Sequence, residues 1–413
     1  MARLISVLGV VLFSGGLAGA CSESGSGVAE QEDAAGAQGF ELLRRGAGSE
    51  SSSLAVRASL HSLGSRLADL QADIIGDSAR NGLSDSDPDD GSWDFLLPPT
   101  ATSHSASASP ENLYGVTGLV HWALLRSGSH NPRWHAASLT TALGAQNNAL
   151  VDSPPDFVYL VLLSDLTEDA GFAELARTRY DAKLAGTGAR ALGERVRDQR
   201  HAQGNDGLIA YDLAWLTLGA AALDAAFPAA GYDADADAYA EVIVRDLSAA
   251  APNFDYRDAK EAFYVQGLAW SLVALSRSNT APELRTEVRT LLLDAQLPSG
   301  AWGWNAAYPS ANLQATAESV QALALTQGAR PRARRAEKRA SNWLISQQAP
   351  NGGYLYTAAL ESPSLDAEVG LALFLAGTSA GARDGLSAEG VATAVQPLSA
   401  GGDGPPLSQP LSL

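Results

Sequence analysis

The segment Gln296–Trp304 has the sequence QLPSGAWGW, and the segment Gln348–Tyr356 repeats its pattern as QAPNGGYLY. Both copies place a glutamine ahead of a glycine, and both place aromatic residues two and four positions after that glycine. A stretch with helical periodicity precedes each copy, and another one follows it. A repeated unit of helix, turn and helix predicts a repeat architecture, in which neighbouring units stack and bury a shared core.

Helical periodicity extends through most of residues 51–379, and the expected helices are of two kinds. Helices at 283–295 and 332–346 carry charge on one face, whereas the others are apolar around their whole circumference. A helix that is apolar on all sides is buried on all sides. Because the two kinds alternate, we predict an all-α fold with an outer and an inner layer. The apolar segments are 113–125, 157–163, 209–223, 263–275, 313–325 and 365–375.

Glycine-aromatic turns mark the points where the chain passes from an outer helix to an inner one. Weaker versions of the repeated turn occur at 91–95 (GSWDF), 207–211 (GLIAY) and 254–256 (FDY), and 146–148 (QNN) stands where a sixth is needed. Glycine reverses the chain past a helix end, and the aromatic pair is expected to fill the wedge between neighbouring hairpins. Six outer and six inner helices therefore predict a closed ring of six helical hairpins.

These turns resemble the QW-type repeats of terpenoid cyclases and protein prenyltransferase β subunits. The inner-helix stretch 316–324 (TAESVQALA) is similar to that family as well. The resemblance covers residues 51–379 as architecture and is specific over residues 280–376. It implies an (α/α)6 toroid with a central cavity, without implying the family's chemistry. The residues that carry it are Gln296, Gly300, Trp302, Gln348, Gly352 and Tyr354.

The catalytic motifs of that family transfer poorly. Prenyltransferases hold zinc with Asp, Cys and His, but the one cysteine here is Cys21, near the N-terminus. Class II terpene cyclases use an Asp-x-Asp-Asp acid, and 87–90 (DPDD) has those letters but precedes the first predicted turn. A protonating acid, a calcium-binding turn at Asp85–Asp90 and a solvated loop remain alternatives for this segment. The six histidines form no metal set, and the sequence predicts no metal site and no cofactor.

The N-terminus resembles an export signal. Arg3 precedes an apolar run at 4–13 that is too short to span a bilayer stably, and 17–21 (LAGAC) resembles a bacterial lipobox. We expect lipidation at Cys21, and Ser22 resembles an outer-membrane sorting signal. The alternative is a plain cleaved signal peptide. The protein is thus predicted to be exported and lipid-anchored in the cell envelope, in the outer membrane.

Composition limits the remaining classes of partner. The formal net charge of −18 disfavours nucleic acid and anionic lipid, so membrane contact is expected through the anchor only. The hydrophobic fraction of 46% is that of a globular chain. We predict a signal peptide at 1–21, a flexible linker at 22–50, the toroid at 51–379 and a disordered tail at 380–413.

Each predicted inner helix carries a carboxylate near its start. In a ring of hairpins these ends converge on one rim, where burial and mutual repulsion raise pKa values. Glu318 lies too deep in its helix to act as a cap, so it is the first candidate for catalysis, with Asp212 and Glu261 as companions. The other acids can instead cap helix N-termini. They are Glu111, Asp156, Asp366 and Glu368.

Aromatic residues on the same segments are candidates for lining the cavity. Tyr114, Tyr159, Trp215 and Tyr264, with Asp366, are the predicted ligand contacts. Trp122, Tyr211 and Trp270 share this pattern, and the alternative for each is core packing. Such a wall suits an isoprenoid chain or a sugar ring.

Three functions are compatible with these features. The first is binding of a hydrophobic or mixed small-molecule ligand in the central cavity. The second is a glycan lyase or hydrolase that uses the rim carboxylates, since glycoside cleavage needs paired acids. The third is a non-catalytic surface scaffold. The sequence does not decide whether the protein is an enzyme, nor its oligomeric state.

Overall fold

The computed structural model describes residues 54–70, 119–120, 123, 154–203, 206–248, 264–277, 281–326, 331–357 and 360–384. The chain divides into two compact units, residues 1–33 and 34–413, and all described residues belong to the second. The predicted signal peptide, Cys21, the segment Asp85–Asp90, Tyr114, Glu261 and the weaker turns at 91–95, 146–148 and 254–256 lie outside the described residues.

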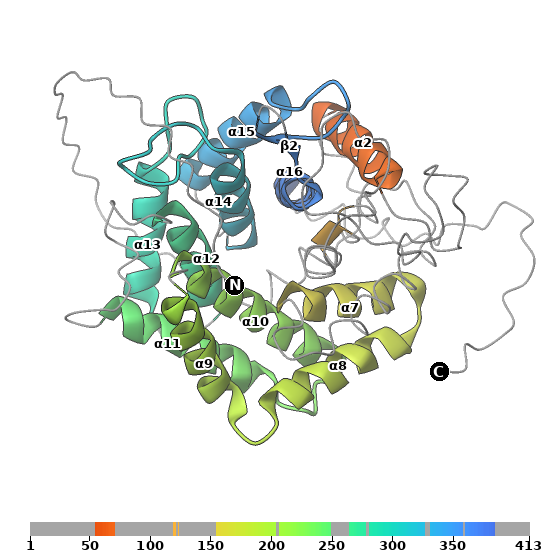
Figure 1. Cartoon of the computed structure of the whole chain (residues 1–413), viewed down its shortest axis with the longest axis vertical. Coiled ribbons are helices and arrows are strands. Elements are labelled where there is room, and N and C mark those ends of the chain that lie inside the picture. The colour runs from red at the N-terminus through yellow and green to blue at the C-terminus, as the bar shows by residue number, and fades with distance from the viewer. Residues whose placement is uncertain are drawn as a thin grey trace, which may run out of the picture. The chain divides into compact units, whose positions relative to one another are not determined.

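The inner layer is a succession of apolar helices, each packed on the next (Figure 1). Helix α7 contacts α10, α10 contacts α12, α12 contacts α14, and α14 contacts α16. Burial agrees with the sequence pattern, because every residue of α12 up to Ser276 is buried. The inner helices are α7 (Pro154–Thr167), α10 (Gly207–Ala226), α12 (Tyr264–Arg277), α14 (Leu313–Leu325) and α16 (Pro363–Asp384).

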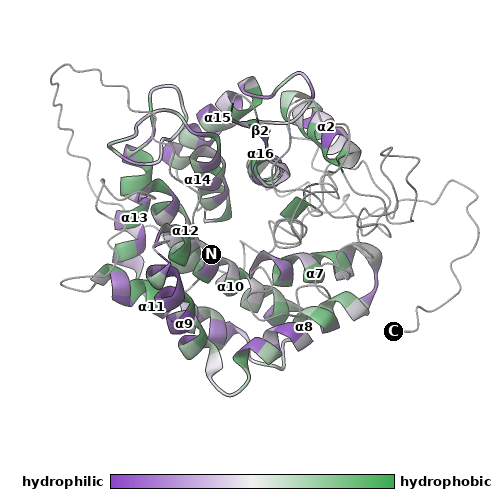
Figure 2. Cartoon of the chain, in the orientation of Figure 1, coloured by the Kyte–Doolittle hydropathy of each residue, from purple (hydrophilic) through white to green (hydrophobic). Residues whose placement is uncertain are grey.

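The outer layer packs on this succession and carries most of the charge. Helix α8 packs on α7, α9 and α11 on α10, α13 on α12, and α15 on α14 and α16. Figure 2 shows the hydrophilic colouring concentrated on outer helices such as α9 and α11. The outer helices are α2 (Leu54–Asp69), α8 (Ala170–Leu184), α9 (Gly188–Ala202), α11 (Asp233–Ser248), α13 (Pro282–Asp294) and α15 (Pro331–Ser346).

Helix α10 is an inner helix with an apolar circumference. Its segment Leu208–Ala226 is long and apolar enough to cross a membrane, but 78% of the most apolar window is buried within the protein. Contacts with α7, α9, α11 and α12 cover it. The apolar circumference is therefore explained by packing between helices.

The first copy of the repeated turn links α13 to α14 and docks on α15. The side-chain amide of Gln296 donates to the carbonyl oxygens of Gly300 (2.8 Å) and of Ala336 in α15 (2.8 Å). Gly300 has a φ of 94°, in the left-handed region that glycine adopts without strain. Trp302 is fully buried, and its Nε1 donates to the Leu292 carbonyl oxygen at 2.7 Å. The burial expected for this aromatic residue is confirmed.

The second copy makes the same contacts with α2. Gln348 donates to the carbonyl oxygens of Gly352 (2.7 Å) and of Ser59 in α2 (3.0 Å). Gly352 has a φ of 93°, and a Cβ there would lie 2.7 Å from the carbonyl oxygen of Ser62. The buried Tyr354 hydroxyl lies 3.2 Å from Ser59 Oγ. Helix α2 thus packs beside α15 as α15 packs beside α13, and this contact closes the N-terminal described helix onto the C-terminal part of the chain.

A buried ion pair reinforces this closure. Arg66 in α2 binds Glu361 through two hydrogen bonds, Nε to Oε1 and Nη2 to Oε2, both of 2.8 Å. The side chains are 6% and 0% exposed, and Asn351 donates a third bond to Glu361 at 2.9 Å. Glu361 belongs to a short antiparallel pair of strands, β1 (Leu355–Thr357) and β2 (Leu360–Glu361).

Three residues represent the sixth inner segment. Leu119, Val120 and Ala123 are buried, as the apolar pattern at 113–125 predicts. A Cβ on Gly370 of α16 would lie 3.6 Å from the Cβ of Ala123, so Ala123 packs beside α16. The fold is therefore an all-α toroid with its apolar helices inside, as predicted.

Two local expectations are wrong. The segment 207–211 is not a turn, because α10 begins at Gly207 and continues through Tyr211. The strict alternation of outer and inner helices also fails, since α8 and α9 follow one another in the outer layer. Glycines with positive φ at 186 and 188 allow the sharp bend between them.

Candidate functional site

The repeated turns place two glutamates at equivalent positions of neighbouring inner helices. In both turns the backbone N–H of the first aromatic residue donates to a side chain of the next inner helix. The acceptors are Thr316 Oγ1 in α14 (2.9 Å) and Asp366 Oδ1 in α16 (2.6 Å). Two residues further along these helices lie Glu318 and Glu368. We refer to Glu318 and Glu368 as the inner carboxyl pair.

Glu318 is completely buried in an almost uncharged environment. Its Oε1 accepts a hydrogen bond of 2.8 Å from Gln266 Nε2 of α12. In the described parts of the chain no lysine or arginine contacts it. Burial raises the pKa of Glu318 to about 8, although Gln266, Trp270 and Gln314 favour the charged form. A carboxyl group with this pKa is mostly protonated at neutral pH and can act as an acid.

Glu368 shares this environment. Gln314 Nε2 donates to its Oε1 at 3.4 Å, and Gln321 Nε2 donates to its backbone oxygen at 2.9 Å. Burial raises the pKa of Glu368 well above its usual range, and the nearby charge of Glu318 raises it further. Two adjacent carboxyl groups in a poorly solvated site do not ionise independently, because the first charge opposes the second.

Several polar atoms around the pair have no hydrogen-bond partner within the described residues. They are Oε2 of Glu318, Oε2 of Glu368, Oε1 of Gln266, Oε1 of Gln321 and Nε1 of Trp270. The Trp270 indole is near enough to lower the pKa of Glu318 but does not meet hydrogen-bond geometry. Buried polar groups are nearly always bonded, so this concentration requires an explanation.

Aromatic side chains of α7, α10 and α12 adjoin the pair. Trp215 and Trp270 have ring centroids 5.4 Å apart, and Tyr211 meets the Trp270 ring edge-on at 5.1 Å. Tyr159 lies 5.7 Å from Trp215. The pKa of the Tyr211 hydroxyl is raised first by its apolar surroundings, and then by Glu368 and Glu318. We call Tyr159, Tyr211, Trp215 and Trp270 the aromatic wall.

Asp212, unlike Glu318, is paired with an arginine. Arg200 of α9 binds Asp212 through Nε to Oδ2 (2.6 Å) and Nη2 to Oδ1 (3.3 Å). Burial raises the pKa of Asp212, and Arg200 acts against this shift. Asp212 therefore anchors the outer helix α9 to α10, and the neighbour of Glu318 is Glu368.

Two other predicted ligand contacts lie at or near the starts of inner helices. Tyr264 begins α12, and its pKa is raised by burial and by the charge of Asp294. Asp366 holds the backbone N–H of Tyr354, and burial and the nearby Glu361 raise its pKa. Tyr159 and Trp215 do lie in the aromatic wall.

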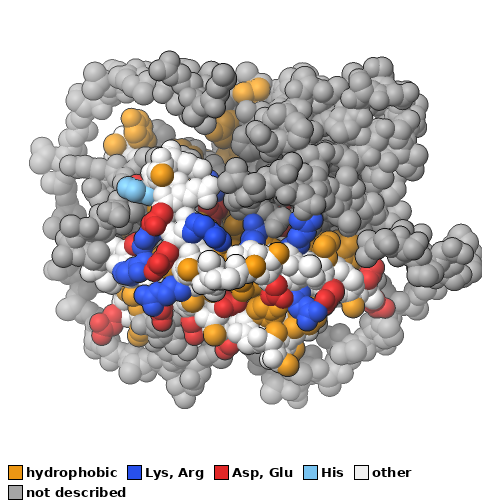
Figure 3. All heavy atoms as spheres, turned by 60° about the horizontal axis from the view of Figure 1, so that its bottom comes forward, with side chains coloured by type: hydrophobic (Ala, Val, Ile, Leu, Met, Phe, Trp, Pro, Cys, Tyr) orange, Lys and Arg blue, Asp and Glu red, His pale blue; other side chains and the backbone are white. Residues whose placement is uncertain are grey.

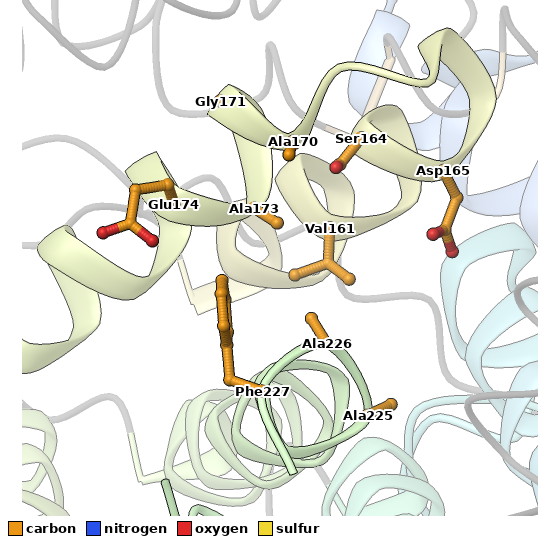
Figure 4. A pocket seen from close by; sticks show the side chains of 10 residues that line it. All are labelled: Val161, Ser164, Asp165, Ala170, Gly171, Ala173, Glu174, Ala225, Ala226 and Phe227. Carbon is orange, nitrogen blue, oxygen red and sulfur yellow. The ribbon is translucent and has the colours of Figure 1, made fainter. Parts of the chain in front are cut away.

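Two pockets lie away from the inner carboxyl pair. One of about 610 Å³ opens between α8 and the C-terminal parts of α7 and α10, with Phe227 on one side (Figure 4). Another of about 440 Å³ lies between α13 and α15. The residues that line the first are Val161, Ser164, Asp165, Ala170, Gly171, Ala173, Glu174, Ala225, Ala226 and Phe227.

The surface of α8, α9 and α11 carries both signs of charge. Figure 3, which brings the lower edge of Figure 1 forward, shows arginine and lysine side chains interspersed with acidic ones. Glu194 pairs with Arg245 at 2.7 Å and with Arg190 at 3.5 Å. Exposed pairs of this kind contribute little, about 0–1 kcal/mol each, and they offer no uniform docking patch.

No protein-family model matches the chain, and no curated protein matches it. Two solved structures are similar to it at the level of helical architecture. One is a possible member of the GH105 family from Salmonella enterica, with 14% identity, 78% of this chain and 93% of that chain covered, and a TM-score of 0.49. The other is the type II terpene cyclase MstE from Scytonema, in complex with geranylgeranyl dihydroxybenzoate. It has 14% identity, 82% and 99% coverage, and a TM-score of 0.45.

Proposed function

We propose that this protein is a lipid-anchored envelope protein whose toroid binds a small ligand with apolar and hydrogen-bonding groups. The proposed site lies between the inner carboxyl pair and the aromatic wall. The observation that carries this proposal is the set of unpartnered polar atoms around Glu318 and Glu368. Leaving a buried polar group unpaired costs about 1–3 kcal/mol, and a bound ligand would recover that free energy.

The aromatic wall supports the same proposal. Trp215 and Trp270 are each 1% exposed, and rings of this size give most of the apolar contact in small-molecule sites. Tyr211 and Gln314 are only partly buried, so they mark the side from which a ligand would approach. The proposed lipid anchor at Cys21 would hold this domain at the membrane.

A ligand screen on the full chain, purified in a nonionic detergent, tests the proposal. Isoprenoids, oligosaccharides and small amines are added, and tryptophan fluorescence and thermal stability are recorded. We expect at least one class to shift both signals, and Glu318→Gln to abolish the shift while circular dichroism stays unchanged. Glu283→Gln, the same substitution at an exposed site of α13, is the control. A uniformly silent screen would favour the scaffold alternative.

Glycan cleavage is the second candidate, because one observation favours it. The inner carboxyl pair places two acids with raised pKa values side by side, and glycoside hydrolysis uses one protonated and one charged carboxyl group. Incubation with envelope and plant oligosaccharides, followed by chromatography, tests this function. Cleavage that survives both Glu318→Gln and Glu368→Gln would exclude the pair as its catalyst.

A further inference from the structure

We propose that the ligand of the inner carboxyl pair is an organic cation, an amine or quaternary ammonium group attached to an apolar body. This inference depends on the proposed small-ligand function and specifies the chemical class of its ligand. Three separate properties of the site support it: the missing counter-charge, the excess of acceptors and the aromatic wall.

The first property is the missing counter-charge. Two other buried acids of the toroid are paired with arginine, Glu361 with Arg66 and Asp212 with Arg200. Glu318 has Gln266 in place of an arginine, and the described residues offer no cation to it or to Glu368. A buried carboxyl group without a neighbouring positive charge stays protonated, and its charged form is costly until a cation accompanies it. A cationic ligand would provide here what arginine provides elsewhere in the fold.

The second property is the balance of donors and acceptors. Six buried atoms of the inner carboxyl pair, its glutamine neighbours and the tryptophans of the aromatic wall have no hydrogen-bond partner within the described residues. Four of them are acceptor oxygens: Oε2 of Glu318, Oε2 of Glu368, Oε1 of Gln266 and Oε1 of Gln321. The other two are the indole Nε1 donors of Trp215 and Trp270. A site that offers mainly acceptors favours a ligand that presents donors or a positive charge. An anionic ligand would meet four acceptor oxygens and, among the described unpartnered atoms, two indole N–H donors, so carboxylates and phosphates are disfavoured.

The third property is the aromatic wall. Tyr211, Trp215 and Trp270 contact one another with centroid separations of 5.1 to 6.4 Å. The face of an aromatic ring attracts a cation, most strongly for tryptophan, and desolvation increases the effect. Carboxyl groups close to aromatic rings would stabilise both the charge and the apolar body of such a ligand.

This geometry links ligand binding to proton release. The carboxyl group of Glu318 is protonated at neutral pH, and a cation favours its charged form. Binding should therefore expel a proton, and affinity should rise about tenfold per pH unit up to about pH 8. A neutral polyol needs no ionised carboxyl group and should lack this dependence. The other titratable groups near the pair are Tyr159 and Tyr211, and the charges of Asp156 and of the arginine-paired Asp212 act on these tyrosines. Asp366 lies two residues before Glu368.

These neighbours do not reverse the sign of the effect. The tyrosine pKa values are raised, so both hydroxyls stay neutral over the pH range of the test. Asp212 is already paired with Arg200. Any carboxylate that ionises near the pair adds negative charge, which strengthens the attraction for a cation as pH rises.

The test compares choline with its uncharged isostere 3,3-dimethylbutan-1-ol on the full chain in nonionic detergent. Calorimetry at pH 6, 7 and 8, in two buffers of different ionisation enthalpy, measures affinity and proton release. We expect choline to bind at least about tenfold more tightly than the isostere at pH 7. Its affinity should increase about tenfold from pH 6 to pH 7 and release close to one proton.

Variants then locate the effect. Glu318→Gln should weaken choline binding at least tenfold and remove its pH dependence, and Glu368→Gln should weaken it as well. Glu283→Gln should change neither. If Glu318→Gln loses helical signal, the comparison of choline with its isostere on the unaltered chain decides the outcome without any variant.

Equal binding of choline and the isostere, or a choline affinity that does not change with pH, would overturn the inference. The small-ligand function would survive either result. Failure of both probes while an isoprenoid or an oligosaccharide binds would likewise refute the cation alone. Calcium chloride is the last arm of the test: calcium binding that Glu318→Gln abolishes, without choline binding, would show that the pair selects a metal ion instead.

Discussion

Replacing Trp302 by alanine tests whether the repeated turn holds neighbouring hairpins together. The side chain is completely buried, and its indole N–H donates to the Leu292 carbonyl oxygen at 2.7 Å. Removing a buried tryptophan side chain costs about 3–5 kcal/mol through lost burial and the cavity that remains. The lost hydrogen bond adds about 1 kcal/mol, so we expect a change in unfolding free energy near the upper end of that range.

The second copy of the turn provides a matched control. Tyr354 is 0% exposed and Tyr356 is 51% exposed, two residues apart in the same turn. Tyr354→Ala should also cost about 3–5 kcal/mol, whereas Tyr356→Ala should cost less than about 0.5 kcal/mol. Urea unfolding of the full chain, followed by circular dichroism, measures all three changes. A loss below about 1 kcal/mol for Trp302→Ala or Tyr354→Ala would refute the plug role.

Other consequences follow from the same structure. Cys21→Ala should release the protein from membranes or leave it unprocessed, as fractionation and mass measurement would show; unchanged retention would contradict lipidation. Arg66→Ala should destabilise the fold by about 3–5 kcal/mol because Glu361 is left charged and buried. The double substitution of Arg66→Met with Glu361→Gln should recover most of that loss. The folded pKa of Glu318 is raised from 4.5 to about 8, so the native state binds the extra proton in that range. Stability should therefore fall as pH rises from about 5 to about 8, and Glu318→Gln should flatten the decline.

The repeated turn was predictable because its backbone conformation depends on residues within the turn. A glycine before an aromatic pair requires a reversal, and Gly300 and Gly352 both adopt positive φ. Their near-equality, 94° and 93°, shows that similar sequence letters encode similar backbone. The apolar segments were predictable for the same reason, because a helix without a polar face has to be surrounded.

The pairing of Glu318 with Glu368 was not predictable from that pattern. Trp302 lies 14 residues before its acceptor Thr316, but Tyr354 lies only 12 before Asp366. An alignment that matches Trp302 with Tyr354 therefore matches Thr316 with Glu368. In the structure the shorter connection moves Glu368 level with Glu318.

The fate of Asp212 was hidden for another reason. Arg200, which binds it, belongs to α9, and two consecutive outer helices break the alternation that the sequence suggested. An arginine that faces inward from an outer helix looks the same in sequence as one that faces solvent. Pattern alone therefore identifies buried acids, but it does not say which of them are neutralised.

The contact between Arg66 and Glu361 has a consequence for how the chain is made. The two residues are 295 positions apart and join α2 to β2. Helix α2 is among the first parts to be synthesised, yet its docking surface is completed only when the last repeated turn and β2 emerge. Contacts of such long sequence separation carry a large loop-closure entropy and slow folding. Until then the early helix has to wait without its partner, so a chain that stops before residue 361 would leave it exposed to aggregation and proteolysis.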